Sequence, residues 1–421
     1  MPRLSLALFL TGLVLIARAQ PYALLIKGGY VIDPKTALHD TLDIAVDNGR
    51  IISIAKHIDP RQAATIIDAR DAIVCPGLID IHTHVFFGAD PDREYDGGTE
   101  GVIPDNFAPR EGVTTVVDAG SSGWRDFEVF KRRVIDRSQT RVLAFLNIVG
   151  AGMRGGPYEQ DTTDMSDSLA AAKARQFKPY IVGFKVAHYR GGDWHPVDAA
   201  VEAGNRTHLP VMIDFGEHQP ELSIRDLFQK HLRPGDIFTH CFAQLNDREP
   251  IVDPATRTLK PFVREAQQKG IRFGVGYGEI SFAFSQAIPA INDGFRPKSI
   301  GSDIHRGNTG VTLPDIMSRF LAMGLDPATV IAMSTWDAAK EIHRPDLGHL
   351  GEGAIADIAI LRVLNGRLLF SDHSGHHIQA GRRFECVMTI KSGRVEYGHS
   401  IPKFTAHSRR PARFHLKTEN K

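Results

Sequence analysis

The sequence contains few cysteines, and no two of them are close together. Only three occur, Cys75, Cys241 and Cys386, and none stands in a Cys-x-x-Cys spacing. An odd number of widely separated cysteines argues against a disulfide framework, even in an exported protein. Without a Cys-x-x-Cys spacing, a cysteine-based zinc site is also disfavoured. Any metal bound by this chain would therefore be held by other side chains.

The sequence also lacks an excess of either charge. Lysine and arginine number 50 and aspartate and glutamate 49, which leaves a formal net charge of +1. A chain without a basic excess gives no electrostatic indication of nucleic acid or of an anionic membrane surface, so we expect neither as a partner. With 42% hydrophobic and 24% charged residues in 421, the composition is typical of a soluble globular protein with one large domain and a smaller companion.

Long hydrophobic runs are absent except near the start. Leu4 to Ile16 is almost wholly apolar, but this run of about 13 residues is shorter than the roughly 20 that a membrane helix needs. Arg3 precedes the run and Ala-Arg-Ala at 17–19 follows it, as in a secretory signal peptide. We expect cleavage after residues 1–19, a periplasmic or extracellular mature protein that is free of the membrane, and metal loading outside the cytoplasm. The alternative is an uncleaved anchor.

Short β-strand patterns occupy both ends of the chain. Residues 20–75 contain several apolar or alternating stretches, and Asp47-Asn48-Gly49 gives a hairpin-turn signal between two of them. Residues 348–400 return to the same pattern. We expect these two segments to pack together as one small β-sandwich domain, and the basic residues 401–421 to form a flexible tail.

Residues 76–347 alternate between strand patterns and helical patterns. The helical patterns include Trp124–Ser138, Asp164–Gln176, Pro196–Thr207 and Lys260–Lys269. Eight such β-then-α units over this length predict an α/β fold, the TIM (β/α)8 barrel. The expected strands are Leu78–His84, Thr114–Ala119, Val142–Val149, Ile181–Ala187, Val211–Phe215, Asp236–Cys241, Ile271–Gly276 and Ser299–Ile304.

Polar residues at the strand ends are the candidates for chemistry, because the active site of a TIM barrel lies at the carboxyl ends of its strands. His82 and His84 stand two apart on the first strand and point the same way, and neutral imidazole suits zinc. Burial lowers the pKa of a lysine, so Lys185 could react with carbon dioxide to give an anionic carbamate, although pairing with a carboxylate is the simpler alternative. The other strand ends carry Asp118, Asn147, Asp214, His240, Tyr277 and Asp303.

Five motifs occur in the order that a barrel would bring together. They are Val74–His84, Gly112–Gly120, Val182–Lys185, Thr239–Phe242 and Gly301–His305. On these motifs the sequence resembles the amidohydrolase superfamily of metal-dependent hydrolases, and within it the dihydroorotase-like amidohydrolase/deacetylase group. The resemblance extends over residues 22–400. It implies a TIM barrel with a β-sandwich and a centre of one or two divalent metal ions, usually zinc.

The resemblance also implies roles for individual residues. His82 and His84 match the metal ligands of the first strand, and His240 matches the ligand of the sixth. Lys185 matches the carboxylated lysine that bridges two metals. Asp303 matches the catalytic aspartate of the eighth strand, which binds metal and handles the proton of the attacking water.

Two positions depart from the family pattern. Asp214 stands at the end of the fifth strand, where histidine is usual. Aspartate is a legitimate metal ligand, so Asp214 is the expected one, but His218 in the following loop could substitute, or the second metal could be lost or weak. On the seventh strand, Tyr277 lies between two glycines, where relatives carry histidine.

Substrate contacts are expected from the loops that follow the strands. An arginine fits a carboxylate bidentately, and Arg154, Arg190 and Arg306 are the candidates. For each arginine the alternative is a solvated loop position. Tyr277 and His305 are further candidates, and for His305 the alternative is a surface role. Two more loop histidines, His188 and His195, follow the fourth strand.

The sequence favours a metal-dependent hydrolase that cleaves an amide or ester bond in a small acylated molecule. Within this class it favours a deacetylase. A cyclic amidohydrolase such as a dihydroorotase or dihydropyrimidinase is the alternative, although export disfavours pyrimidine biosynthesis, whose intermediates are cytosolic. A third hypothesis is a non-catalytic barrel that binds small molecules, to which only Asp214 points. The sequence leaves open the substrate, the metal and its count, and whether the chain forms a homo-oligomer.

Overall fold

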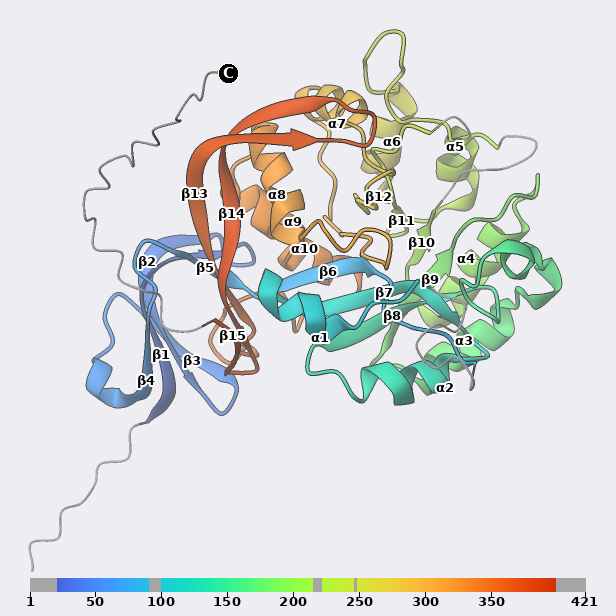
Figure 1. Cartoon of the computed structure of the whole chain (residues 1–421). Helices are drawn as coiled ribbons and strands as arrows, with labels where there is room; N and C mark the ends of the chain where they lie inside the picture. Colours follow the sequence, from blue (N-terminus) through green and yellow to red (C-terminus); the bar gives the residue numbers. More distant parts are fainter. Residues whose placement is uncertain (1–20, 91–99, 215–221, 246–247, 399–421) are drawn as a thin grey trace, which may run out of the picture.

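The computed structural model describes residues 21–90, 100–214, 222–245 and 248–398. These residues form a β domain and a barrel that lie side by side (Figure 1). The expected signal peptide, the tail at 401–421 and His218 all lie outside the described residues. In the part of the chain that is described, no helix combines the length and the apolar character needed to cross a membrane.

The β domain is built on one eight-stranded sheet. Its strand order is β15-β14-β13-β5-β1-β2-β3, and β4 pairs with β1 on the same side as β5. The antiparallel pairing of β13 with β5 joins the two ends of the chain, so both terminal segments build one β domain, as the sequence predicts. The strands are β1 (Tyr22–Asp33), β2 (Leu38–Asp47), β3 (Arg50–Ala55), β4 (Ala63–Asp68), β5 (Ile73–Pro76), β13 (Ile358–Ser371), β14 (His377–Lys391) and β15 (Arg394–Tyr397).

Local sequence explains the turns of this sheet. The predicted hairpin at Asn48-Gly49 joins β2 to β3, and both residues adopt positive φ, which the tight turn requires. β1 pairs with β2 along most of its length, and a single irregularity between Ile26 and Gly29 shifts the register without ending the strand.

The barrel strands are parallel and run β6 to β12 in chain order. An eighth segment closes the ring, since it bridges to Gly274 at Ser299 and to Thr83 at Ile304. The TIM barrel predicted from the sequence is therefore confirmed. The strands are β6 (Leu78–Thr83), β7 (Val113–Gly123), β8 (Arg141–Asn147), β9 (Ile181–Val186), β10 (Val211–Ile213), β11 (Ile237–Phe238) and β12 (Arg272–Phe273).

Two barrel strands are shorter than expected. The sixth covers only Ile237–Phe238, within the predicted 236–241, and the seventh covers Arg272–Phe273, within the predicted 271–276. The backbone turns into the left-handed region soon after each strand, at His240 (φ 53°) and Gly276 (φ 47°), which ends regular pairing.

The helices lie around the barrel strands, and α10 lies beside the start of β6 (Figure 1). The expected helix at Trp124–Ser138 is present only as the short α2, continued by a π-type turn over Lys131–Ile135. The helices are α1 (Pro104–Phe107), α2 (Phe127–Phe130), α3 (Asp167–Gln176), α4 (His195–Thr207), α5 (Ile224–Asp226), α6 (Pro261–Lys269), α7 (Phe284–Asn292), α8 (Leu313–Ala322), α9 (Pro327–Met333) and α10 (Trp336–Glu341).

The barrel interior is apolar towards the amino ends of its strands. Ile79, Val117 and Phe145 pack there in one cluster with Ala338 of α10 and Ile342 just after it. Because α10 covers this end, the polar side chains of the strands gather at the opposite, carboxyl end.

A long hairpin links the β domain to the barrel. β13 and β14 arch beside the barrel helices (Figure 1), and the Oγ of Ser318 in α8 accepts a hydrogen bond of 2.8 Å from the backbone N–H of Phe384 in β14. At the hairpin turn, Asp372 accepts a 2.8 Å hydrogen bond from the N–H of Phe284, the first residue of α7. The two parts are therefore coupled by buried hydrogen bonds.

Candidate metal centre and active site

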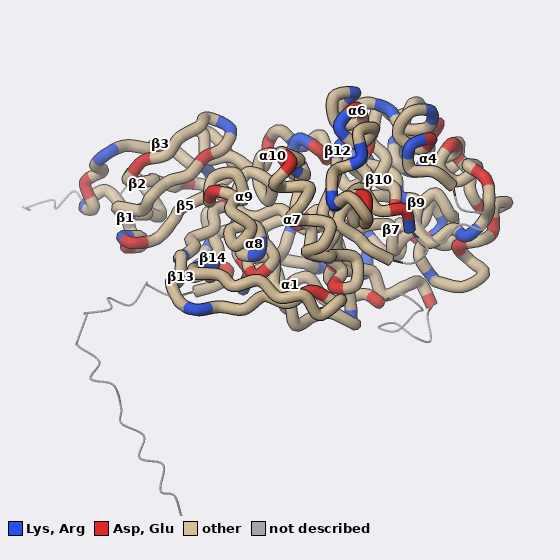
Figure 2. The backbone as a smooth tube through the Cα atoms, turned by 90° about the horizontal axis from the view of Figure 1, so that it is seen from above, with Lys and Arg blue, Asp and Glu red and all other residues tan. Residues whose placement is uncertain are grey.

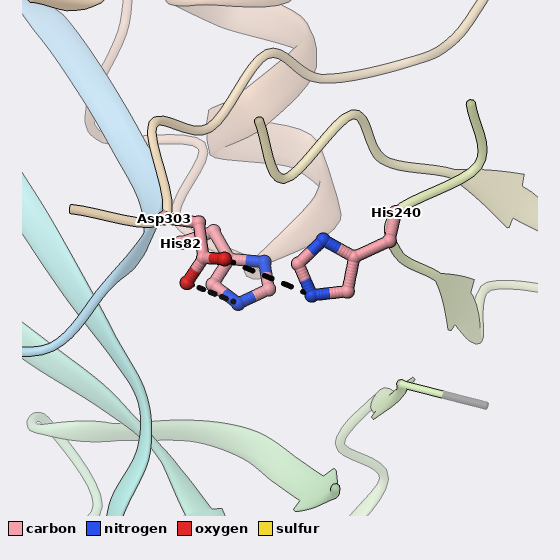
Figure 3. A group of neighbouring side chains, drawn as sticks. All are labelled: His82, His240 and Asp303. Atoms are coloured by element: carbon pink, nitrogen blue, oxygen red, sulfur yellow. Dashed lines mark ion pairs between the residues drawn. The ribbon is translucent and has the colours of Figure 1, made fainter. Parts of the chain in front are cut away.

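Four side chains meet at the carboxyl end of the barrel: His82, His84, His240 and Asp303. Asp303 Oδ1 lies 3.0 Å from His84 Nε2 and 3.4 Å from His82 Nε2, and its Oδ2 lies 3.9 Å from His240 Nε2. Figure 3 shows Asp303 and the two rings of His82 and His240 directed at one another. One potential ligand atom from each of these three residues fits within 4.8 Å, a spacing that suits a single metal ion.

Closure of the barrel brings these residues together. The N–H of Asp303 donates a 2.7 Å hydrogen bond to the carbonyl of His82, which fastens the eighth segment to the first strand. Asp303 and His240 both adopt positive φ, at 53° each. Non-glycine residues rarely adopt this conformation, and it is held here at the two positions that turn their side chains into the centre.

The far nitrogen of each histidine ring has its own partner. The Nδ1 atoms of His82, His84 and His240 lie 2.9 Å from Thr239 Oγ1, 3.0 Å from Ser121 Oγ and 2.6 Å from the Gly276 carbonyl. Because a carbonyl only accepts, His240 donates from Nδ1 and presents the lone pair of Nε2 to the centre. Such outer hydrogen bonds fix ring orientation and tautomer in metal sites.

The protonation states suit a cation. Burial, followed by the charge of Lys185, lowers the pKa of His82 well below its usual value, so its imidazole is neutral. Burial alone would raise the pKa of Asp303, but the attraction of nearby basic groups, together with the hydrogen bond to His84, holds this pKa well below its usual range and favours the ionised carboxylate. Neutral imidazole beside an ionised carboxylate is the kind of donor set that binds zinc and similar divalent ions.

Lys185 lies in the same centre, as the sequence predicts. Its side chain is 0% exposed, and its Nζ lies 3.3 Å from His82 Nε2 and 3.8 Å from the sulfur of Met212. Burial lowers the pKa of this amine. Gly120 on β7 makes room for it, because a Cβ at that position would lie 2.6 Å from Lys185 Cγ.

Asp214 is also in the centre, and its nearest partner is a residue that the sequence does not predict. Its Oδ2 lies 3.3 Å from His240 Nε2, whereas its Oδ1 accepts a hydrogen bond from the guanidinium of Arg248. Arg248 lies in the loop after β11, and its side chain is only 9% exposed. No pattern in the sequence marks this residue, because a lone arginine in a polar loop is normally solvated.

A cavity of about 640 Å³ opens above the centre. It is lined by the six predicted metal-site residues and by two predicted substrate contacts, Arg154 and His305. The Arg154 guanidinium lies 4.9 Å from the centre of the Tyr158 ring, and His305 Nδ1 lies 2.8 Å from the Asp303 carbonyl. Both are therefore held in place at the cavity wall.

Other predicted contacts lie elsewhere. Tyr277 does not line the cavity. Its buried ring packs against Phe282 and Arg319 in the outer core, because the glycines on either side turn the backbone there. Arg190 lines only a smaller neighbouring pocket, and His195 and Arg306 are exposed outside the cavity.

The other residues that line the cavity include a paired histidine and glutamate. His188, known from the sequence only as a loop histidine, lies 2.8 Å from Glu159 Oε2 through its Nδ1. Glu159 is buried although it belongs to a short 3-10 turn in a polar segment. No sequence pattern marks Glu159, since burial of that loop depends on the folded barrel.

Comparison with known proteins gives the family. The Amidohydrolase family matches residues 283–395. A deacetylase of Brucella anthropi is 30% identical over 82% of this chain and 85% of its own length, and a dihydroorotase of Trichlorobacter lovleyi is 43% identical over 20% of each chain. The crystal structure of an adenine deaminase superposes with a TM-score of 0.78 and 25% identity, covering 90% of this chain and all of that one. The chain therefore belongs to the amidohydrolase family of metal-dependent hydrolases.

Proposed function

We propose that this protein is a deacetylase that hydrolyses the amide, or the ester, of a small acetylated carboxylic acid. The observation that carries the proposal is the convergence of three histidines, Lys185 and Asp303 on the floor of a cavity large enough for a small molecule. The name of the Brucella anthropi relative, which aligns over most of both chains, supports the same activity.

The residues present fit a divalent cation. His82, His84, His240 and Asp303 would hold it, since imidazole nitrogens and a carboxylate face one another there and the opposite ring nitrogens are already occupied. Zinc is the proposed ion, because imidazole nitrogens and a carboxylate are among its usual ligands in hydrolytic sites. A bound cation of this kind lowers the pKa of a water molecule to about 7 and polarises a substrate carbonyl.

Asp303 is the proposed general base and acid. Its carboxylate is ionised and faces the cavity between the imidazoles, so it can accept the proton of the attacking water and return it to the leaving nitrogen or oxygen. The side chains of the centre are buried, and the lower local polarity strengthens these electrostatic contacts.

Lys185 is the proposed site of carboxylation. Its unprotonated amine would form a bond to the carbon of carbon dioxide and release one proton, leaving an anionic carbamate next to His82. The complete burial of Lys185 and its lowered pKa favour the neutral amine that this reaction needs. The carbamate would add an oxygen ligand to the centre.

Arg154 is the proposed partner of the substrate carboxylate. It lines the cavity, and its planar guanidinium suits bidentate binding of a carboxylate. His305 lies on the cavity wall next to Asp303 and would contact the same substrate.

We also propose that residues 1–19 direct export and that the working partner is a small molecule rather than nucleic acid. The apolar run and the Ala-Arg-Ala site support export. The even mixture of acidic and basic residues along the chain (Figure 2) supports the absence of a nucleic-acid partner.

The test is a substrate panel assayed with residues 20–421 supplied with zinc. Release of acetate from N-acetyl or O-acetyl derivatives of small carboxylic acids is the expected result. Ring opening of dihydroorotate or dihydropyrimidines, without acetate release from any member of the panel, would instead establish the cyclic amidohydrolase. Inactivity towards both groups would contradict the proposal.

A further inference from the structure

Asp214 is surrounded by basic side chains. The guanidinium of Arg248 donates directly to its Oδ1, and on the other side its Oδ2 lies 3.3 Å from His240 Nε2 and 3.7 Å from His188 Nε2. The negative charge of Asp214 is therefore already balanced by groups of this chain.

Arg248 differs from the other basic groups because its charge is permanent. A guanidinium stays protonated at any pH that a folded protein tolerates. Here it is held by a charge-assisted hydrogen bond, and the two side chains are 9% and 6% exposed. A divalent ion on the Oδ2 atom of Asp214 would therefore lie beside a fixed positive charge, where little water screens the repulsion.

The second carboxylate of the centre, Asp303, shares His240 with Asp214, but its other ion-pair partners are imidazoles rather than a guanidinium. Among the described residues, the ion-pair partners of Asp303 are His82, His84 and His240. Imidazoles lose their proton readily and then serve as metal ligands, whereas a guanidinium cannot. One side of the cavity floor is thus suited to a metal ion, and the other is filled by a cation of the protein itself.

We propose that Arg248 takes the place of a second metal ion, so that the centre holds one divalent cation and Asp214 binds the guanidinium instead of a metal. The cation is held by His82, His84, His240 and Asp303. Arg248 lines the cavity and supplies a fixed positive charge on the Asp214 side, where it can stabilise negative charge that develops on a substrate oxygen. This inference rests on the proposed metal-dependent function and specifies its centre.

The experiment is elemental analysis of metal per chain. Residues 20–421 are equilibrated with excess zinc and then freed of loosely bound ions, for the wild type and for three variants. Arg248→Gln removes the charge, Arg248→Lys retains it as a matched control, and Asp214→Asn removes the carboxylate. Circular dichroism checks that each variant is folded.

We expect one zinc ion per chain in the wild type, in Arg248→Lys and in Asp214→Asn, and an increase towards two in Arg248→Gln. Two ions in the wild type, loss of the metal in Asp214→Asn, or a count that stays at one in Arg248→Gln would each overturn the inference. If Arg248→Gln does not fold, the metal content of the wild type and of Asp214→Asn still tests the inference. A wild type without metal would contradict the proposed function itself, whereas a wild type with two ions would contradict only the role of Arg248.

Discussion

Asp303 and the three histidines around it form a small group in which burial sets the charges. The ring of His82 is 2% exposed, so its imidazole favours the neutral form, while the carboxylate of Asp303 remains ionised because the rings surround it. At the scale of single residues, the proposed metal-binding role is shared among four side chains, whereas the proposed proton-transfer role depends on the carboxylate of Asp303 alone.

Replacing Asp303 by asparagine should separate these two roles. The amide keeps the size of the side chain but cannot accept a proton from the attacking water, so we expect turnover to fall by roughly 10²- to 10⁴-fold. Metal content should stay largely intact, because the histidines are unchanged. Assays of turnover and elemental analysis of the same samples provide the measurement, and Asp40→Asn, at a partly exposed position of β2, is the control. Full activity of Asp303→Asn would exclude the assigned role.

Replacing Arg154 by glutamine should change substrate selection. Without the guanidinium, KM should rise about tenfold or more for acetylated substrates that carry a carboxylate, since a charge-assisted hydrogen bond contributes about 1.5–3 kcal/mol. KM for neutral acetamides should not change. Arg190→Gln is the matched control, because Arg190 lines only the neighbouring pocket. An equal effect on charged and neutral substrates would contradict a carboxylate contact.

At the scale of secondary-structure elements, the spacing between β7 and β9 determines whether a buried lysine fits. Gly120 on β7 adopts a φ of 92°, and its missing side chain leaves the space that the Lys185 stem occupies. The carbonyl of the same glycine accepts a 3.0 Å hydrogen bond from the side chain of Asn147 on β8. One glycine therefore ties three neighbouring strands to the position of Lys185.

Gly120→Ala should destabilise the barrel and displace Lys185. The new Cβ would crowd Lys185 Cγ at 2.6 Å, and overpacking of this kind typically costs about 1–3 kcal/mol. Gly324→Ala is a suitable control, because Gly324 has a nearly equal φ of 94° but a Cβ there would have no neighbouring atom within 4 Å. Urea unfolding should show a larger loss for Gly120→Ala than for Gly324→Ala. Equal losses would show that backbone conformation alone explains the glycine.

At the scale of the whole molecule, a buried carboxyl group lies where the barrel meets the β domain. Glu111 precedes β7 and accepts a 2.7 Å hydrogen bond from the N–H of Leu313, at the start of α8. Nearby, Thr389 of β14 donates a 2.6 Å hydrogen bond to the carbonyl of Pro109. Burial raises the pKa of Glu111 to about 8, so this carboxyl group is protonated in the folded protein at neutral pH.

This shift predicts a loss of stability at alkaline pH. The pKa is higher in the folded than in the unfolded chain, so the unfolded chain releases its proton first as the pH rises above about 4.5, and the free energy of unfolding falls until the pH passes about 8. Glu111→Gln removes this contribution and should be more stable than the wild type at pH 9, by on the order of 2–4 kcal/mol.

Denaturant unfolding at pH 5, 7 and 9 measures this effect. The advantage of Glu111→Gln should shrink towards pH 5, because the unfolded wild-type chain also begins to keep the Glu111 proton as the pH approaches about 4.5. Glu265→Gln on the exposed face of α6 should show no such pH dependence. A constant difference between Glu111→Gln and wild type across this range would mean that Glu111 does not titrate as inferred.

The sequence by itself determined the barrel, the two-part β domain and most of the candidate metal centre. Strand period and strand ends are local properties, so alternation and turn residues locate His82, His84, Lys185, His240 and Asp303 before any packing is known. These side chains come together because the barrel closes, and the eight alternating strand and helix patterns in the sequence already imply that closure.

Only the tertiary structure decided which loop residues join that centre. Tyr277 turns away from the cavity into the aromatic core, whereas Arg248 and Glu159 are buried at its wall, although all three lie at or beyond strand ends. The direction of a loop side chain depends on contacts with segments distant in sequence, and no local pattern records those contacts. The pairing of Asp214 with Arg248, residues 34 apart in the chain, is therefore visible only once the fold has brought them together.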